Sequence, residues 1–90
     1  MRGLTPVVWY LIWAMEGARV MQTQAIYRAF KAVCDQHKHK LPLHWRDEVR
    51  QTLQAHCPSR PRWNGKDDFF VFHRREHWSC KIKPPTPDEL

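Results

Sequence analysis

Six histidines and three cysteines are the side chains of this chain best suited to chemistry. Two segments group them at spacings that could supply metal ligands, residues 34–39 (CDQHKH) and residues 73–80 (HRREHWSC). Structural zinc prefers paired ligands at close spacing, and neither segment has a Cys-x-x-Cys pair. His37 and His56 are expected on apolar helix faces, where a packed, hydrogen-bonded histidine is common. The sequence therefore predicts no metal and no cofactor.

Cysteine chemistry is not expected either. Cys57 directly follows His56, and adjacent residues of a helix point about 100° apart, so the spacing alone does not make a catalytic dyad. A small buried thiol is the simpler interpretation. The sequence has no phosphate-binding loop and no Ser-x-Gly elbow, and Asp67 and Asp68 are expected to shape the start of a strand. We therefore expect no enzymatic activity.

The charge of the chain favours a polyanionic partner. Its net charge is +6 and its pI about 9.7, which suits nucleic acid or an anionic membrane surface. Most of the positive charge is concentrated in residues 36–66, which carry seven Lys or Arg and two acidic residues, a net charge of +5. The candidate function is therefore binding, through the surface that these residues form.

The elements that must position this surface follow from periodicity and turn signals. Pro6 and the apolar run to residue 16 predict a first helix, with Thr5 as a candidate cap. The rest of the chain predicts a short strand at 19–21, helices at 22–37 and 44–56, and strands at 69–72 and 78–82 joined by a reversal at 73–77. We expect one domain over residues 1–83 and a disordered, proline-rich tail at residues 84–90.

The second and third helices are predicted to be amphipathic. In the second, Thr23 is a candidate cap, Ile26 and Phe30 share the apolar face, and Tyr27 lies toward the other side together with basic residues. In the third, the apolar face carries Trp45, Val49 and Leu53.

This order of elements predicts an α+β fold, a winged helix-turn-helix with three helices and a small antiparallel β-wing. Such folds usually insert the third helix in the major groove of DNA and lay the wing along the backbone or the minor groove. Arg reads guanine and Gln reads adenine through paired hydrogen bonds. We therefore expect base contacts from the outward side of residues 44–56, namely Arg46, Arg50, Gln51 and Gln54.

Contacts with the DNA backbone are expected from the residues around that helix. Lys and Arg neutralise phosphates, and such contacts fix the position of a protein on the duplex. The candidates before the helix, in the loop after it and in the wing are Lys38, Lys40, Arg60, Arg62, Asn64, Lys66, Arg74, Arg75 and Lys81.

A simpler interpretation of the third helix is a solvated face without a partner. Asp47 and Glu48 can pair locally with Arg50 or Gln51, and mixed charges on a helix are usually only exposed to water. The basic flanks and the basic wing favour DNA over this alternative. Trp63, in a polar basic loop, is expected either to pack onto the helix or to stack on a base.

Residues 24–81, about two thirds of the chain, resemble the small winged-helix modules attached to restriction endonucleases and related defence proteins. The residues that carry this resemblance are Ile26-Tyr27, Trp45-Arg46, Val49-Arg50, Thr52-Leu53-Gln54, His56, Trp63-Asn64-Gly65, Asp67 or Asp68 with Phe69 or Phe70, and Trp78. The resemblance implies DNA recognition, sometimes of modified bases, without chemistry in the module itself.

The chain departs from the family pattern at two informative positions. The glycine that precedes the tryptophan of the wing is replaced by Arg75-Glu76-His77, which predicts a wider and more charged wing tip. The serine after His56 is Cys57. No nuclease domain accompanies the module, which suits a small regulator or an accessory defence factor of phage or bacterial origin.

Two other kinds of partner stay open. The apolar first helix could form a homodimer or bind a partner protein, as an inhibitor or assembly factor would. RNA binding is a third option, although the chain lacks a clear platform for stacking single-stranded bases.

The compartment is inferred from the cysteines and the apolar N-terminus. Cys34, Cys57 and Cys80 do not form a disulfide framework, which favours the reducing cytoplasm. Residues 4–15 are too short to span a bilayer, so no membrane contact is expected. The alternative is secretion, with a signal peptide cleaved near residue 14 or 18 and a C-terminal PDEL that resembles an ER-retention signal.

Overall fold

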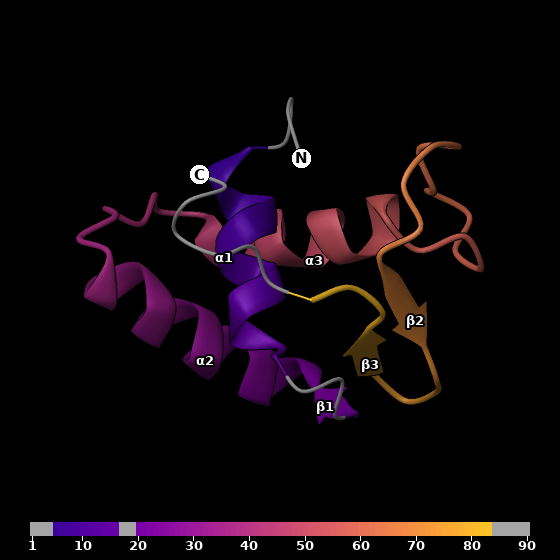
Figure 1. The fold of residues 1–90 in the computed structure, drawn as a ribbon, viewed down its shortest axis with the longest axis horizontal. Coiled ribbons are helices and arrows are strands. Elements are labelled where there is room, and N and C mark those ends of the chain that lie inside the picture. The colour runs from indigo at the N-terminus through magenta and orange to yellow at the C-terminus, as the bar shows by residue number, and fades with distance from the viewer. Residues whose placement is uncertain (1–4, 17–19, 84–90) are drawn as a thin grey trace.

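A computed structural model describes residues 5–16 and 20–83 of the chain as a small α+β domain. Three helices surround a core, and a three-stranded antiparallel sheet lies at one end of it (Figure 1). The elements are α1 (Pro6–Ala14), β1 (Met21–Gln22), α2 (Thr23–Gln36), α3 (Trp45–Ala55), β2 (Phe70–Phe72) and β3 (His77–Cys80). The predicted class and element order are therefore confirmed, while the predicted tail at 84–90 lies outside the described residues.

Helix α1 is the central helix of the domain. It packs against both α2 and α3 (Figure 1), which explains why its apolar residues lie all round its circumference. Val8, Leu11 and Ile12 are buried. The helix ends at Ala14, two residues before the predicted end, and the side chain of Thr5 makes no capping hydrogen bond.

Two predictions about α2 are wrong. Gln22 occupies the N-cap position without a side-chain capping bond, and the side chain of Thr23, the first residue of the helix, bonds to Glu76, far along the chain. Tyr27, predicted on the outer side, is buried with its ring edge against Trp45, at a centroid distance of 5.9 Å. The face that α2 buries is wider than the predicted one, because α3 covers it in addition to α1.

The sheet has the strand order β1-β3-β2, so β3 is its central strand. Met21 pairs with Trp78 on one side of β3, and Phe72 pairs with Trp78 on the other. The first strand is Met21–Gln22 where 19–21 was predicted, and residue 19 lies outside the described part. Strand β3 begins at His77, one residue early, and ends at Cys80 instead of residue 82.

The three cysteine thiols are buried and unpaired. Burial, followed by the negative charge of Asp35, raises the pKa of Cys34 to about 11. Burial also raises the pKa of Cys80. The thiol of Cys57 lies 3.3 Å from the hydroxyl of Ser59, and His56 bonds elsewhere. The prediction that Cys57 is a small buried thiol is therefore confirmed, and the other two cysteines are buried as well.

We expect Cys34 to resist thiol reagents in the folded protein. With a pKa of about 11, only about one molecule in a thousand carries the reactive thiolate at pH 8. Labelling with a chromogenic disulfide at that pH should be roughly a hundredfold slower in buffer than in denaturant, and should accelerate as the pH rises toward the folded-state pKa. Labelling of Cys34 at equal rates in both solutions, located by peptide mass analysis, would contradict this.

Within residues 5–16 and 20–83, no helix has both the length and the apolar character needed to cross a bilayer.

Candidate functional site

The outward face of α3 brings together four of the predicted site residues. Arg50, Gln51, Gln54 and Arg62 line one hollow of about 260 Å³, together with Asp47. Four of these residues belong to α3, and Arg62 comes from the loop that follows it. The hollow therefore combines two guanidinium groups, two amides and one carboxylate, all of which form hydrogen bonds in fixed directions.

Arg46 points away from this hollow. Its guanidinium lies 4.4 Å from the ring centre of Trp45, its neighbour in the chain. A cation placed over the face of a tryptophan is attracted by the ring electrons. Arg46 is exposed, so it remains accessible at the edge of the α3 surface, but the structure does not group it with the other α3 candidates.

Arg50 is joined to the turn between β2 and β3 through a residue that sequence reasoning missed. Its Nη2 donates to Oε1 of Glu76 at 3.0 Å, and the two side chains are 49% and 46% exposed. The partners are 26 residues apart. In the sequence, the residues around Glu76 indicated only a charged turn. Neighbouring residues could not indicate a partner 26 positions away.

Glu76 also closes the start of α2. Its backbone carbonyl accepts the backbone N–H of Thr23 at 2.8 Å. The hydroxyl of Thr23 lies 3.0 Å from both this carbonyl and Oε2 of Glu76. Thr23 is the first residue of α2, and a carboxylate is favourable at the positive end of a helix. Glu76 thus performs for α2 the capping role predicted for the side chain of Thr23.

The turn between β2 and β3, predicted as the tip of a wing, is tighter than predicted. His77 donates its N–H to the carbonyl of Arg74 at 3.0 Å, and the two residues between them have positive φ values, 49° at Arg75 and 64° at Glu76. Two central residues with positive φ define a type I′ turn, which matches the twist of a hairpin. The expectation of a wider tip was wrong, because Arg75 and Glu76 adopt the left-handed conformation without glycine.

Replacing Arg75 by asparagine is expected to stabilise the domain. Asparagine tolerates the left-handed conformation better than arginine does, so the free energy of unfolding should rise by about 0.5–1 kcal/mol. Thermal or denaturant unfolding measures the change. The matched control is Arg74→Asn, which removes the same charge at a residue without positive φ and should bring no gain. Equal stabilisation by both variants would attribute the gain to charge and not to the turn.

The flank of the wing is cationic. His73, Arg74, Arg75 and His77 line a hollow of about 490 Å³ together with Val20. Nδ1 of His77 donates to the carbonyls of Arg74 and Arg75 at 3.1 and 2.9 Å, which fixes the ring against the turn. Two arginines therefore stand exposed at this turn.

Lys81, the other basic residue assigned to the wing, is already paired. It binds both carboxylate oxygens of Asp68 at 2.9 Å. Its charge is therefore offset within the domain, and Asp68 shapes the start of the hairpin as the sequence predicted.

Two candidates in the loop after α3 have structural roles. Oδ1 of Asn64 accepts the backbone N–H groups of Lys66 and Asp67 at 2.9 and 3.0 Å, and Gly65, which directly follows Asn64, has a φ of 79°. The side chain of Asn64 is therefore used in closing the turn. Arg60 lies 4.3 Å above the ring of Phe72, with Nε buried and lacking a hydrogen-bond partner among the described residues. Lys66 remains exposed.

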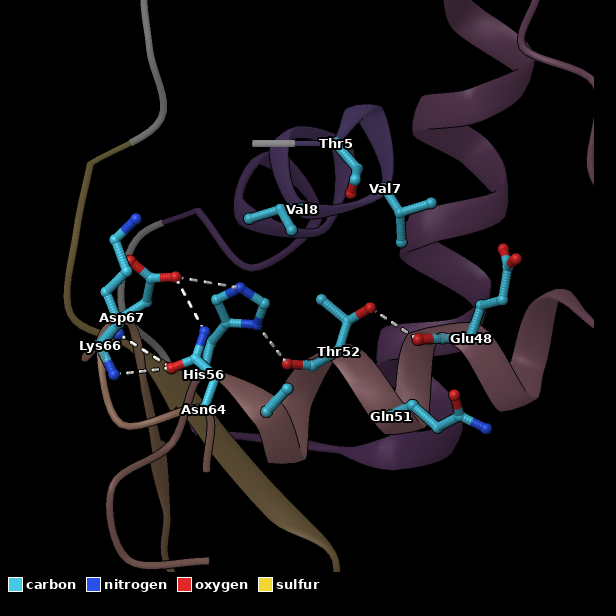
Figure 2. Close-up of a pocket in the computed structure, with 11 residues that line it drawn as sticks. Thr5, Val7, Val8, Glu48, Gln51, Thr52, His56, Asn64, Lys66 and Asp67 are labelled. Carbon is cyan, nitrogen blue, oxygen red and sulfur yellow. Dashed lines mark hydrogen bonds and ion pairs between the residues drawn. The ribbon is translucent and has the colours of Figure 1, made fainter. Parts of the chain in front are cut away.

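A second hollow, of about 690 Å³, lies between the start of α1, one side of α3 and residues 64–67. Figure 2 shows His56 and Asp67 pointing toward one another at one end of it. Nδ1 of His56 donates to the carbonyl of Thr52 at 2.9 Å, and its Nε2 is 3.5 Å from Oδ2 of Asp67. The ring also stacks on Phe69, so His56 is packed and hydrogen-bonded as predicted.

The two segments considered for metal binding are used in packing. In the first, His37 stacks in parallel on Trp13 with ring centres 4.8 Å apart. In the second, His73 bonds to Ser79, and the Cys80 thiol donates to the carbonyl of Ile82. Over the described ranges, no three His, Cys, Asp or Glu side chains lie close enough together to hold a metal ion.

The fold and the site define a small α+β domain with an open, polar and cationic surface. No family model matches the chain, and neither a curated protein nor a solved structure does. What the surface binds is therefore inferred from its own residues.

Proposed function

We propose that the chain is a non-enzymatic DNA-binding protein of the winged-helix class. The order helix, strand, helix, helix, strand, strand, with β3 in the centre of the sheet, supports this class. The turn at residues 74–77 is then the tip of the wing, and α3 is the helix that enters the major groove.

The observation that carries the proposal is the set of side chains around the α3 hollow. Arg50, Gln51 and Gln54 lie on the outward side of α3, and Arg62 from the following loop joins them. Arginine forms paired hydrogen bonds with guanine O6 and N7, and glutamine does so with adenine N6 and N7. A major groove about 12 Å wide admits a helix that carries such groups.

The remaining exposed cations suit contacts with phosphates. Lys66 lies beside α3, Arg74 and Arg75 lie on the wing, and Lys38 and Lys40 precede α3, all of them exposed. Arg46 joins this group because it lies outside the hollow. Asn64 and Arg60 hold the loop in shape and make no direct contact in this proposal.

The resemblance to winged-helix modules of restriction-associated proteins supports the same function. Those modules recognise DNA without chemistry of their own, which fits the structural roles of His56 and Cys57 here. A small regulator or defence-associated factor is the role that we propose.

The proposal is tested by fluorescence anisotropy with a mixed-sequence duplex at about 50 and 200 mM salt. A protein that makes several phosphate contacts loses affinity steeply over this range. Salt-sensitive binding supports the proposal, whereas no binding at the lower salt concentration would overturn it. A duplex RNA competitor tests the third option, since the deep, narrow major groove of RNA does not admit α3.

Lys66→Ala is expected to weaken binding to all duplexes alike. Lys66 is exposed beside the α3 surface, so its loss removes about one phosphate contact and reduces the slope of log K against log salt by about one. Lys31→Ala, which removes an equal charge from the exposed side of α2, is the control and should leave the slope nearly unchanged. Equal effects of the two variants would indicate an influence of net charge only.

A protein partner at α1 is the second candidate, and an aromatic group favours it. The group consists of the rings of Tyr10, Trp13, His37 and His39, and the centroids of the rings in contact are 4.8–5.9 Å apart. All four side chains are at least partly accessible. Such a surface suits a homodimer or a hetero-complex. Association through it should persist between about 50 and 200 mM salt, because burial of apolar area is not weakened as phosphate contacts are.

A further inference from the structure

We infer that Glu76 is a positioning residue that holds Arg50 in the geometry that reads guanine, so that the wing sets a base preference of α3. This inference rests on the proposed function and deepens it. It assigns one base to the ligand, a guanine at the position that Arg50 reaches in the major groove. It also assigns an acidic residue of the wing to specificity, although every other expected contact is basic or an amide.

The geometry leaves Arg50 free to bind a base while it is held. The guanidinium offers five N–H donors in a rigid fork, and the bond to Glu76 uses only Nη2, at 3.0 Å. Within the described residues, the structure gives this guanidinium no other hydrogen-bond partner. The side chain is 49% exposed and lines the α3 hollow. One edge of the fork is therefore held by Glu76, and its other donors remain available in the hollow for a base edge.

Glu76 is itself held on the side away from Arg50. Oε1 binds Arg50, whereas Oε2 and the backbone carbonyl meet the hydroxyl and the N–H of Thr23. Thr23 is 4% exposed, and its hydroxyl accepts Nε1–H of Trp78 at 3.2 Å. A continuous set of bonds thus leads from the core through Thr23 and Glu76 to Arg50.

The backbone conformation of Glu76 also helps to hold its carboxylate beside Arg50. Its φ of 64° is one that side-chain-bearing residues rarely adopt, and it points the carboxylate back toward α2 and α3. Strained conformations persist where the surrounding contacts determine them, and they are frequent at functional sites. A long arginine side chain loses considerable freedom when it binds a base, and the ion pair removes part of that freedom before DNA arrives.

A merely structural ion pair predicts a different result. If the pair only fastened the wing to α3, its loss would weaken binding to all duplexes alike. If Glu76 only repelled phosphates, its neutralisation would strengthen binding to all duplexes alike. Only a positioning role predicts a change in the ratio of the affinities for two duplexes that differ at one base pair.

The experiment is binding selection from a duplex library with a randomised centre, followed by sequencing of the bound fraction for wild type and variants. In the wild type we expect one position with a guanine preference of roughly tenfold or more. Glu76→Gln should lower that preference at least about threefold, while affinity for the unselected library stays equal or rises because a negative charge is lost. Arg50→Lys keeps the charge without the fork and should abolish the preference.

The control is Asp68→Asn, which removes the same charge and another exposed ion pair, that with Lys81. It should leave the guanine preference unchanged. An unchanged preference in Glu76→Gln would overturn the inference and leave the proposed function standing, whatever the result for Arg50→Lys. Absence of library binding by the wild type at low salt would overturn the proposed function itself, so the two failures are distinct. Thermal unfolding of each variant verifies that the compared proteins are folded.

Discussion

Replacement of Trp78 by alanine is expected to lower the free energy of unfolding by about 3–5 kcal/mol. Trp78 lies in the central strand and is 2% exposed. Its ring meets Phe72 edge-on at 4.9 Å, and its Nε1–H donates to Thr23. The substitution therefore opens a cavity and also leaves the buried hydroxyl of Thr23 without its donor. Since small domains are stable by only about 5–15 kcal/mol, the variant should be near the limit of folding.

Trp63→Ala is the matched control for this prediction. Trp63 is 38% exposed, and its Nε1–H donates to the carbonyl of Asp67 within the loop. Its loss should cost about 1 kcal/mol or less. Chemical denaturation followed by circular dichroism measures both variants, because each removes one tryptophan fluorophore. Similar losses of stability in the two variants would show that the core around Trp78 contributes no more than the loop.

The double substitution Arg50→Ala with Arg62→Ala is expected to have the largest effect on DNA binding. Both residues line the α3 hollow, and a single arginine that contacts a base contributes about 1–3 kcal/mol. The pair should therefore cost about 2–4 kcal/mol, which is roughly a thirtyfold to thousandfold loss of affinity for a selected duplex. Anisotropy titration at constant salt measures it.

The control for charge is Arg28→Ala with Lys31→Ala, which removes the same two positive charges from exposed positions of α2. This variant should bind within about threefold of the wild type, since distant exposed charges are largely screened. An equal loss in both double variants would mean that the protein attracts DNA by net charge and that the α3 hollow has no special part.

Sequence periodicity and local turn signals were sufficient to predict the helices and strands. Each described helix or strand begins or ends within about two residues of its predicted bounds, because Pro6, Pro58 and the Asn64-Gly65 turn act locally. Tyr27 shows where this reasoning stops. Its position on the helix was correct, but whether that position is inside or outside depends on α3, which covers the side of α2 that periodicity alone assigned to solvent.

The sequence predicted which residues share the candidate site, but it did not predict which partners their side chains contact. The sequence indicated that Arg50, Gln51 and Gln54 share the outward side of a helix, since this follows from 3.6 residues per turn. It did not indicate that Asn64 closes the turn of its own loop or that Arg60 packs over the ring of Phe72 in β2. The hydrogen-bonding groups of a side chain are visible in sequence, but its partner depends on the path of the backbone.

The sequence alone was enough to predict the three helices and the hairpin, most of the apolar residues of the core and the position of the excess positive charge. These depend on interactions between residues close in the chain and on burial of apolar area, which composition and period encode. Only the tertiary structure decided that Glu76 closes the start of α2, adopts a left-handed conformation and holds Arg50. Residues 53 and 26 positions apart meet there, and such contacts exist only after the helices and the sheet have packed into one domain.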